Sequence, residues 1–368
     1  MTWRVNELMD LKIWLAIVWF GQVNEIKIYN FIENVDKISV KIINFAIYFK
    51  ATTTTRMRNK KIDILSVGEL LIDMISTDFA ETMDEAEMFK RIPGGSPANL
   101  CMNMKRLGNN VRLVSTVGKD DMGHYLMNYV KNLGLEILSM RQVAFPTTLI
   151  LVTRSQNVSN FEAYRGADCR ISANQLNEKL LENVAIFHTT CFALSKKPAQ
   201  TNILKAARIA AGLGCQLSID VNYAQKIWEN QEEAQRIVAE FCSHGAFVKC
   251  SEVDWERLYN SKLTDAEAAA HHFLKLGAKD ACITLGGEGC LVASNTEGAH
   301  FLPSRKVEVK DTTGAGDAFW SAYLTGRLDG HDIVNAAKAG RRMAELKLAH
   351  FGPLPTIVDK NVVYEDTM

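Results

Sequence analysis

Short apolar runs alternate with amphipathic stretches along the chain from residue 62 onward, and this alternation predicts the secondary structure. Apolar runs typical of buried strands are Ile62–Val67, Val111–Thr116, Val184–Thr189, Gln216–Asp220, Ala246–Lys249 and Asp280–Leu285. Helical patterns occupy Pro97–Leu107, Met122–Leu133, Ala199–Leu213, Gln231–Cys242, a stretch capped by Thr264 and ending at Leu276, Ala315–Leu328 and Asp332–Leu348. Further β-like runs are Thr147–Thr153, Phe161–Tyr164 and Gly289–Ser294. The pattern predicts an α/β fold with a mostly parallel central sheet flanked by helices on both faces.

Residues 1–56 do not share this alternation. They contain one glycine and no proline, and their apolar run Ile13–Phe20 is too short to span a bilayer. From Met57 the sequence has a few charged residues followed by an expected strand, which is typical of the N-terminus of a cytosolic protein. Our interpretation is that Met57 is the natural first residue and that residues 1–56 are upstream sequence, included because the start of translation was assigned wrongly. The alternative is a genuine extension that precedes a domain over 57–368.

Composition narrows the class of protein. The chain has 368 residues, of which 47% are hydrophobic and 23% charged, with a net charge of zero. The chain therefore has no excess of positive charge that would attract nucleic acid or a membrane surface as a partner. The eight cysteines include no C-x-x-C pair and the eight histidines show no metal-binding spacing, which indicates a cytoplasmic protein with reduced thiols and no zinc site.

The segment DTTGAGDAF carries the clearest chemical signal. Gly314, Ala315 and Gly316 directly precede an expected helix, so their backbone N–H groups can approach an anion at the positive end of the helix dipole. Asp317 would stand beside that anion, where a carboxylate can accept a proton from an alcohol. The alternative is a tight turn with an ordinary carboxylate in the first helical turn. A Walker A loop and the protein-kinase motifs are absent from the sequence.

A second glycine cluster, GGSPAN, opens the expected helix at Pro97. Gly94 and Gly95 would allow a ligand to approach the backbone, and Asn99 offers an amide to hydroxyl groups. Asp73, which follows the first strand, has the chemistry to bind two adjacent hydroxyls of a polyol. Each feature alone is equally typical of a turn or a surface.

Taken together, VGELLIDMI, GGSPANLCMNMKRLGNNVRLVSTVGKDDMGHYL, YRGAD, DVN, VKCSE, ITLGGEG and DTTGAGDAF resemble the pfkB-type, ribokinase-like carbohydrate kinases in order and spacing. The resemblance covers about 62–357, and GGSPAN is more similar to fructokinases than to ribokinases. It implies a ribokinase-like fold with a small β-sheet lid, formed here by about 73–93 and 145–165, that closes over the sugar. Two such lids pack into a homodimer in some members.

The resemblance also implies a role for individual residues. Sugar contacts fall on Asp73, Gly94, Gly95, Asn99, Arg165, Asp220 and Asn222. The nucleotide site falls on Lys249, Thr284, Gly286, Gly289, Asp311 and Thr313. Glu252 would organise Mg²⁺ through water, and backbone carbonyls near Asp311 and Thr313 would hold K⁺. Gly314, Ala315 and Gly316 would form the anion hole, with Asp317 as the general base.

The implied activity is ATP-dependent transfer of the γ-phosphoryl group to the primary hydroxyl of a sugar, with fructose as the expected acceptor. One departure stands in DVNYAQKIW, where Ala224 replaces an arginine that relatives often carry. Loss of this cation disfavours a sugar acid as acceptor and casts doubt on ordinary fructokinase behaviour. A 2-keto-3-deoxygluconate kinase, a ribokinase-like kinase, a nucleoside kinase and a non-catalytic sugar-binding or scaffold protein of the same fold remain as alternatives.

Overall fold

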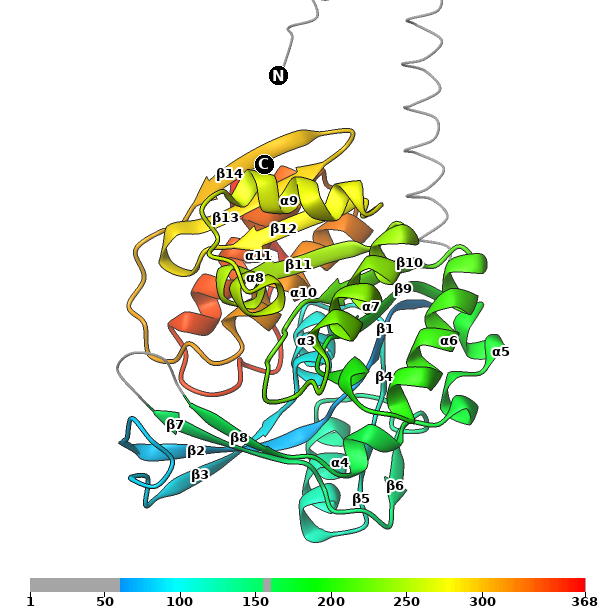
Figure 1. Cartoon of the computed structure of the whole chain (residues 1–368), viewed down its shortest axis with the longest axis vertical. Coiled ribbons are helices and arrows are strands. Elements are labelled where there is room, and N and C mark those ends of the chain that lie inside the picture. Colours follow the sequence, from blue (N-terminus) through cyan, green and yellow to red (C-terminus); the bar gives the residue numbers. More distant parts are fainter. Residues whose placement is uncertain (1–59, 155–159, 368) are drawn as a thin grey trace, which may run out of the picture. The chain divides into compact units, whose positions relative to one another are not determined.

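A computed structural model describes residues 60–154 and 160–367, which contain an eight-stranded sheet in the order β14-β13-β12-β11-β10-β9-β1-β4 (Figure 1). Its strands are β1 (Ile62–Val67), β4 (Val111–Val114), β9 (Val184–Thr190), β10 (Gln216–Asp220), β11 (Phe247–Ser251), β12 (Asp280–Thr284), β13 (Gly289–Ser294) and β14 (Gly298–Pro303). The six strands from β4 to β12 pair in parallel, whereas β13 and β14 run antiparallel at one edge. The predicted mostly parallel sheet is confirmed.

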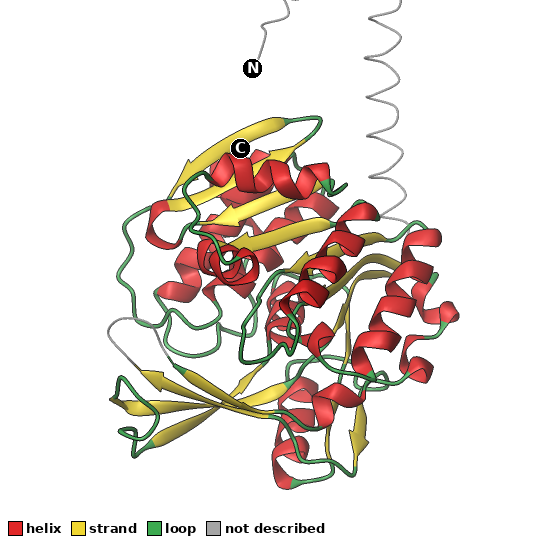
Figure 2. Cartoon of the chain, viewed as in Figure 1, coloured by secondary structure: helices red, strands yellow, loops and turns green. Residues whose placement is uncertain are grey.

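Helices cover both faces of this sheet, as Figure 2 shows. They are α3 (Ser96–Arg106), α4 (Asp121–Asn132), α5 (Glu178–Leu181), α6 (Ala199–Gly212), α7 (Gln231–Ser243), α8 (Glu252–Tyr259), α9 (Ala266–Lys275), α10 (Ala315–Leu328), α11 (Ile333–Leu348) and α12 (Lys360–Tyr364). Side chains of α6, α7 and α9 form one apolar core with the sheet, and those of α3, α4 and α10 form another. Neighbouring strand residues such as Ile64 and Leu65 enter different cores, because successive strand side chains point to opposite faces.

A second sheet of four strands, in the order β3-β2-β7-β8, stands apart from the large one (Figure 1). Its strands are β2 (Leu71–Phe79), β3 (Phe89–Gly94), β7 (Leu149–Arg154) and β8 (Phe161–Tyr164). They come from the two segments expected to form a lid, and closure over a ligand stays a prediction. A third, two-stranded sheet joins β5 (Thr116–Gly118) to β6 (Arg141–Val143).

Two predictions about the elements are wrong in detail. The expected strand Val111–Thr116 is broken at Ser115, because Thr116–Gly118 leaves the large sheet to pair with β6. The helix expected to be capped by Thr264 is capped by Asp265, whose side chain accepts from the backbone N–H groups of Glu267 and Ala268. The sequence analysis also did not predict the edge strand β14 or the short helix α8.

All eight cysteines are buried, as the sequence predicted. Among residues 60–154 and 160–367, no helix is long and apolar enough to cross a membrane. The interpretation of residues 1–56 lies outside the described residues.

Candidate active site

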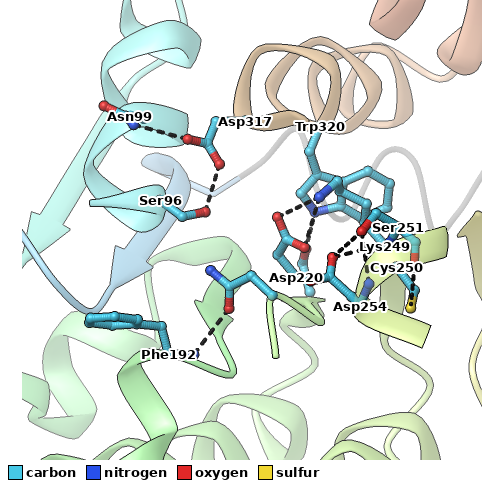
Figure 3. Close-up of polar contacts among 12 residues, drawn as sticks. Ser96, Asn99, Phe192, Asp220, Lys249, Cys250, Ser251, Asp254, Asp317 and Trp320 are labelled. Carbon is cyan, nitrogen blue, oxygen red and sulfur yellow. Dashed lines mark hydrogen bonds and ion pairs between the residues drawn. The ribbon is translucent and has the colours of Figure 1, made fainter. Parts of the chain in front are cut away.

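Asp317 lies in the first turn of α10, and its carboxylate is held by two side chains of the GGSPAN segment (Figure 3). The Ser96 hydroxyl donates to Oδ1 at 2.6 Å, and the Asn99 amide donates to Oδ2 at 2.9 Å. Burial raises the pKa of Asp317 to about 6, although the hydrogen bonds from Ser96 and Asn99 oppose this shift. The result is a carboxylate that is oriented on both oxygens and titrates near neutral pH.

The glycine loop before Asp317 exposes backbone at the start of α10. Gly314 is the N-terminal cap, has a left-handed backbone with φ of 74°, and provides no side-chain cap. A β-carbon at this position would stand 3.7 Å from Asp317 Oδ2 and 3.8 Å from Asn99 Nδ2, so the absent side chain opens space beside the carboxylate. The Ala315 N–H donates to the Thr312 carbonyl at 3.2 Å. The N–H groups of Gly314 and Gly316 are therefore the better candidates for binding an anion.

Asp73 of β2 approaches the same place from the second sheet. Its carboxylate lies, partly buried, against Gly94, where a β-carbon would collide with Oδ2. Burial raises the pKa of Asp73 to about 7, and the nearby charge of Asp317 adds to the shift. Gly95 packs against the backbone carbonyl of Glu69, so the GGSPAN turn accommodates no side chain there. The structure thus brings Asp73, Gly94, Gly95 and Asn99 together around Asp317.

A buried ion pair lies on the other side of the loop. The Lys249 ammonium of β11 donates to both carboxylate oxygens of Asp220 at the end of β10, each at 2.9 Å (Figure 3). A β-carbon on Gly316 would stand 3.3 Å from Lys249 Nζ, which places this ammonium beside the glycine loop. Burial alone would lower the pKa of Lys249, but Asp220 and Asp254 raise it, so the side chain carries its charge.

The predicted nucleotide residues follow along the carboxyl ends of β11 and β12. Glu252 begins α8, and its Oε1 would lie 3.4 Å from a β-carbon on Gly286. Thr284 ends β12 opposite Cys290 of β13, and Gly289, the first residue of β13, accepts from the Leu285 N–H at 2.9 Å. Within the described part of the chain, no cluster of three acidic, histidine or cysteine side chains could hold a metal. One carboxylate at the edge of a phosphate site fits Mg²⁺, since this ion keeps most of its waters and binds largely to the substrate phosphates.

Arg165 is held more tightly than the sequence analysis expected. Its guanidinium pairs with Asp168, donates to the Ser195 hydroxyl at 2.8 Å and lies over the Phe192 ring, 4.0 Å from its centre. Asn222 accepts from the Phe192 N–H at 3.0 Å, so it belongs to the same group of contacts. Contact of Arg165 or Asn222 with a sugar stays a prediction. Ala224 packs, partly buried, against the apolar core that contains α6, α7 and α9.

Asp311 and Thr313 lie just before the glycine loop, but Asp311 uses its carboxylate for contacts within the protein. Oδ1 accepts from the Thr313 N–H at 2.9 Å, and Oδ2 accepts from Lys347 Nζ at 2.9 Å. A pocket that begins at Asp73, Asn99 and Gly314 continues past these side chains to Lys347.

Sequence analysis missed three side chains that the structure brings to the site. Ser96 lies inside the GGSPAN motif, and only the fold shows that its hydroxyl reaches Asp317. Asp254 lies partly buried near Lys249 and accepts hydrogen bonds from Ser251 in a capping box, a pattern that the segment Ser251–Asp254 displays in sequence. Lys347 lies 36 residues from Asp311, and no local signal links the two.

The fold and this site define a class of protein. A partly buried carboxylate beside a glycine loop at a helix N-terminus, at the carboxyl ends of parallel strands, is an arrangement for phosphoryl transfer to a hydroxyl. A model of the pfkB family of carbohydrate kinases matches residues 61–359. The chain belongs to the pfkB family of carbohydrate kinases, and it is therefore a sugar kinase that transfers a phosphoryl group to an alcohol.

Individual relatives support this assignment. An ATP-dependent 6-phosphofructokinase of Thermoanaerobacterium thermosaccharolyticum is 33% identical over 305 residues, which cover 83% of this chain and 94% of the relative. Fructokinase-1 of Zea mays is 34% identical over 269 residues, which cover 71% of this chain and 81% of the relative. The structure of Halothermothrix orenii fructokinase matches with a TM-score of 0.66 and 30% identity, covering 77% of this chain and 96% of that chain.

Proposed function

We propose that this sugar kinase transfers the γ-phosphoryl group of ATP to a primary hydroxyl of fructose, with Asp317 as the general base. The observation that carries the proposal is the position of Asp317, which lies partly buried at the N-terminus of α10 and is oriented by Ser96 and Asn99. Fructose and ATP are supported by the names of the relatives, since several are fructokinases and one is an ATP-dependent kinase.

In this mechanism Asp317 accepts the proton of the attacking hydroxyl while the loop stabilises the transferring phosphoryl group. The acceptor would lie between Asp73 and Asn99, which offer a carboxyl and an amide to its hydroxyls. The N–H groups of Gly314 and Gly316 would face the phosphoryl oxygens, and the Lys249 ammonium beside Gly316 adds positive charge to that position. Mg²⁺ bound with ATP supplies charge neutralisation, and Glu252 would hold it through water.

The four-stranded sheet formed by β2, β3, β7 and β8 is proposed to act as the lid. Asp73 lies on β2, so a movement of this sheet would carry a substrate-binding carboxyl toward or away from Asp317. Closure would exclude water and suppress ATP hydrolysis. Packing of two lids into a homodimer stays part of the same proposal.

Fructose 6-phosphate is a second candidate acceptor. One observation favours it: the relative named as a 6-phosphofructokinase aligns over 83% of this chain, whereas the maize fructokinase aligns over 71%. A phosphorylated acceptor needs a cation for its phosphate. Arg165 is already paired with Asp168 and Ser195, so this arginine would have to exchange partners to provide one.

The test is ADP release with ATP and Mg²⁺ and a panel of acceptors. The panel contains fructose, fructose 6-phosphate, glucose, ribose, 2-keto-3-deoxygluconate and adenosine. Asp317→Asn should lower kcat on the preferred acceptor by about 10³-fold, since general-base catalysis contributes roughly 10² to 10⁴. Asp329→Asn is the matched control, because Asp329 caps the opposite end of α10 and should leave kcat unchanged.

Each outcome decides between the alternatives. The proposal is supported if the enzyme phosphorylates fructose and Asp317→Asn loses most of this activity. Turnover on fructose 6-phosphate or another acceptor keeps the base and replaces the substrate. Sugar binding without ADP release on any acceptor would contradict the catalytic role and favour a non-catalytic sugar-binding protein.

A further inference from the structure

An ammonium group, that of Lys347, lines the same pocket as Gly314 of the glycine loop. Lys347 occupies the last turn of α11, and its side chain is only 9% exposed. Nζ donates to Asp311 Oδ2 at 2.9 Å and to the His350 carbonyl at 3.4 Å. A lysine side chain is seldom this buried unless its charge is paired, and here a carboxylate and a carbonyl both face the ammonium.

Asp311 connects this ammonium to the loop. The Gly352 N–H donates to the same oxygen as Lys347, at 3.1 Å, and the Thr313 N–H donates to Oδ1 at 2.9 Å. The backbone beside it is paired as well, because the Lys310 N–H donates to the Leu348 carbonyl at 2.8 Å. Asp311 thus connects, through hydrogen bonds, the segment after α11 to the residues that precede Gly314. Burial would raise the pKa of Asp311, but the contacts with Lys347, Thr313 and Gly352 lower it below its ordinary value.

These contacts do not fit the K⁺ site that the family resemblance implied near Asp311 and Thr313. A cation site needs several oxygens free to face the ion. Here the nearby backbone carbonyls of Thr312, Leu348 and His350 already accept hydrogen bonds, from the Ala315 N–H, the Lys310 N–H and the Lys347 ammonium. Both carboxylate oxygens of Asp311 accept hydrogen bonds as well. A K⁺ ion beside Asp311 would also meet the like charge of the ammonium at short range.

We infer that Lys347 is a built-in cation that holds the phosphate-binding loop through Asp311, so that this kinase works without K⁺. Lys347 is a positioning residue: it acts through Asp311 and Thr313 on the backbone of Gly314. The inference rests on the proposed function of that loop. The ammonium, Asp311, Thr313 and Gly314 line one pocket, so the charge also lies close enough to the loop to favour an anion there.

The first experiment uses the full chain with no substitution. Initial rates of ADP release are measured in choline, Na⁺, K⁺ and NH₄⁺ chloride at equal ionic strength. We expect rates that agree within about twofold, because the ion's place is already filled. A saturable rise with K⁺, absent with Na⁺ and choline, would overturn the inference.

The second experiment removes the charge. Lys347→Met keeps the length and the apolar stem, and in choline it should lower kcat/KM for ATP by about tenfold or more. K⁺ or NH₄⁺ should restore most of this loss in a saturable manner, since either ion can enter the vacated place. Lys347→Arg retains a charge and should stay independent of K⁺. Lys360→Met is the matched control: it breaks an ion pair of the same 2.9 Å length with Asp329, at the far end of α10.

A readout other than turnover separates this inference from the proposed function. Melting temperatures are measured in the same salts. K⁺ should raise the melting temperature of Lys347→Met relative to choline and leave the wild-type and Lys360→Met proteins unchanged, because an ion that binds the folded state stabilises it. This difference would appear even if none of the tested acceptors were turned over. Lys347→Met without rescue by K⁺ in either assay would contradict the inference. If Lys347→Met does not fold, the wild-type salt series and Lys347→Arg decide it.

Discussion

At the scale of single residues, the chemistry depends on how Asp317 is held. Burial favours its protonated form, whereas the Ser96 hydroxyl and the Asn99 amide favour the carboxylate. The balance leaves the pKa at about 6, so the group is ionised at neutral pH yet basic enough to accept a proton. An exposed aspartate would be ionised over a wider range but would be a weaker base.

The rate should therefore fall on the acid side. Asp317 acts as a base only when it is ionised, so kcat/KM for the acceptor should decrease as the pH falls through about 6 and level off above it. The check is a pH profile of initial rates from about pH 5 to 8.5, with ATP saturating. A profile that stays level down to about pH 4.5 would contradict the raised pKa.

Ser96→Ala should move the pH at which kcat/KM begins to fall to a higher value. The substitution removes the donor to Oδ1, and one charge-assisted hydrogen bond is worth about 1.5 kcal/mol, or roughly one pH unit. The same pH profile measures the shift. Ser321→Ala is the control, because this buried hydroxyl of α10 bonds to the Ala318 carbonyl and not to Asp317. Equal profiles for Ser96→Ala and the wild type would show that Ser96 does not tune the base.

At the scale of elements, the site is made where two helix N-termini meet. The first turn of α3 provides Ser96 and Asn99, and the first turn of α10 provides Asp317. The glycine caps Gly95 and Gly314 keep both ends clear of side chains. The N-terminus of α10 favours an anion, whereas the Ser96 N–H of α3 already donates to the Glu69 carboxyl group at 3.2 Å.

Gly314→Ala, compared with a control glycine, should show that the loss of activity is distinct from the loss of stability caused by backbone strain. The alanine would keep a left-handed backbone at a cost of about 1–2 kcal/mol in unfolding free energy, and its methyl would enter the space beside Asp317. We expect kcat/KM to fall by about tenfold or more, because the acceptor hydroxyl is displaced. Gly108→Ala is matched in backbone, with φ of 84° and no heavy atom within 4 Å of the added β-carbon. Urea unfolding should show similar losses for both variants, with full activity only in Gly108→Ala.

At the scale of the whole molecule, segments far apart in the chain build one site. Asp73 comes from the four-stranded sheet, Lys249 and Asp220 from the large sheet, Asp317 from α10 and Lys347 from α11. A displacement of the four-stranded sheet would move Asp73 of β2 and Gly94 of β3. The loop, the base and the buried ion pair all belong to the larger layer of sheet and helices, which supports the proposed role of the small sheet as a moving lid.

A chain that begins at Met57 should retain the full activity and stability of the kinase. The family match starts at residue 61, and the first strand follows at once with Ile62. We expect kcat on the preferred acceptor to agree within about twofold with that of the 368-residue chain, with the same midpoint in urea. A chain from Met57 that is unfolded or inactive would show that residues 1–56 are part of the working protein.

Local pattern was sufficient for most elements because helices and buried strands depend on neighbouring residues. The apolar runs of β1, β9, β10 and β12 predicted those strands, and the helical patterns of α7 and α10 predicted those helices. The sequence pattern did not predict strands whose limits or existence depend on pairing with another strand. Ser115 divides an apolar run because its second half pairs with β6, and β14 forms only by pairing with β13.

The sequence by itself determined the α/β class, the family and the two glycine motifs, since each is written in residues close together in the chain. Only the tertiary structure decided that Ser96 and Asn99 hold Asp317, that Arg165 is bound by Asp168 and Ser195, and that Lys347 faces Asp311. Ser96 and Asp317 are 221 residues apart, and Lys347 and Asp311 are 36 apart. A hydrogen bond or ion pair requires atoms to approach within about 3 Å, and at such separations along the chain only the packing of helices and sheets sets that distance.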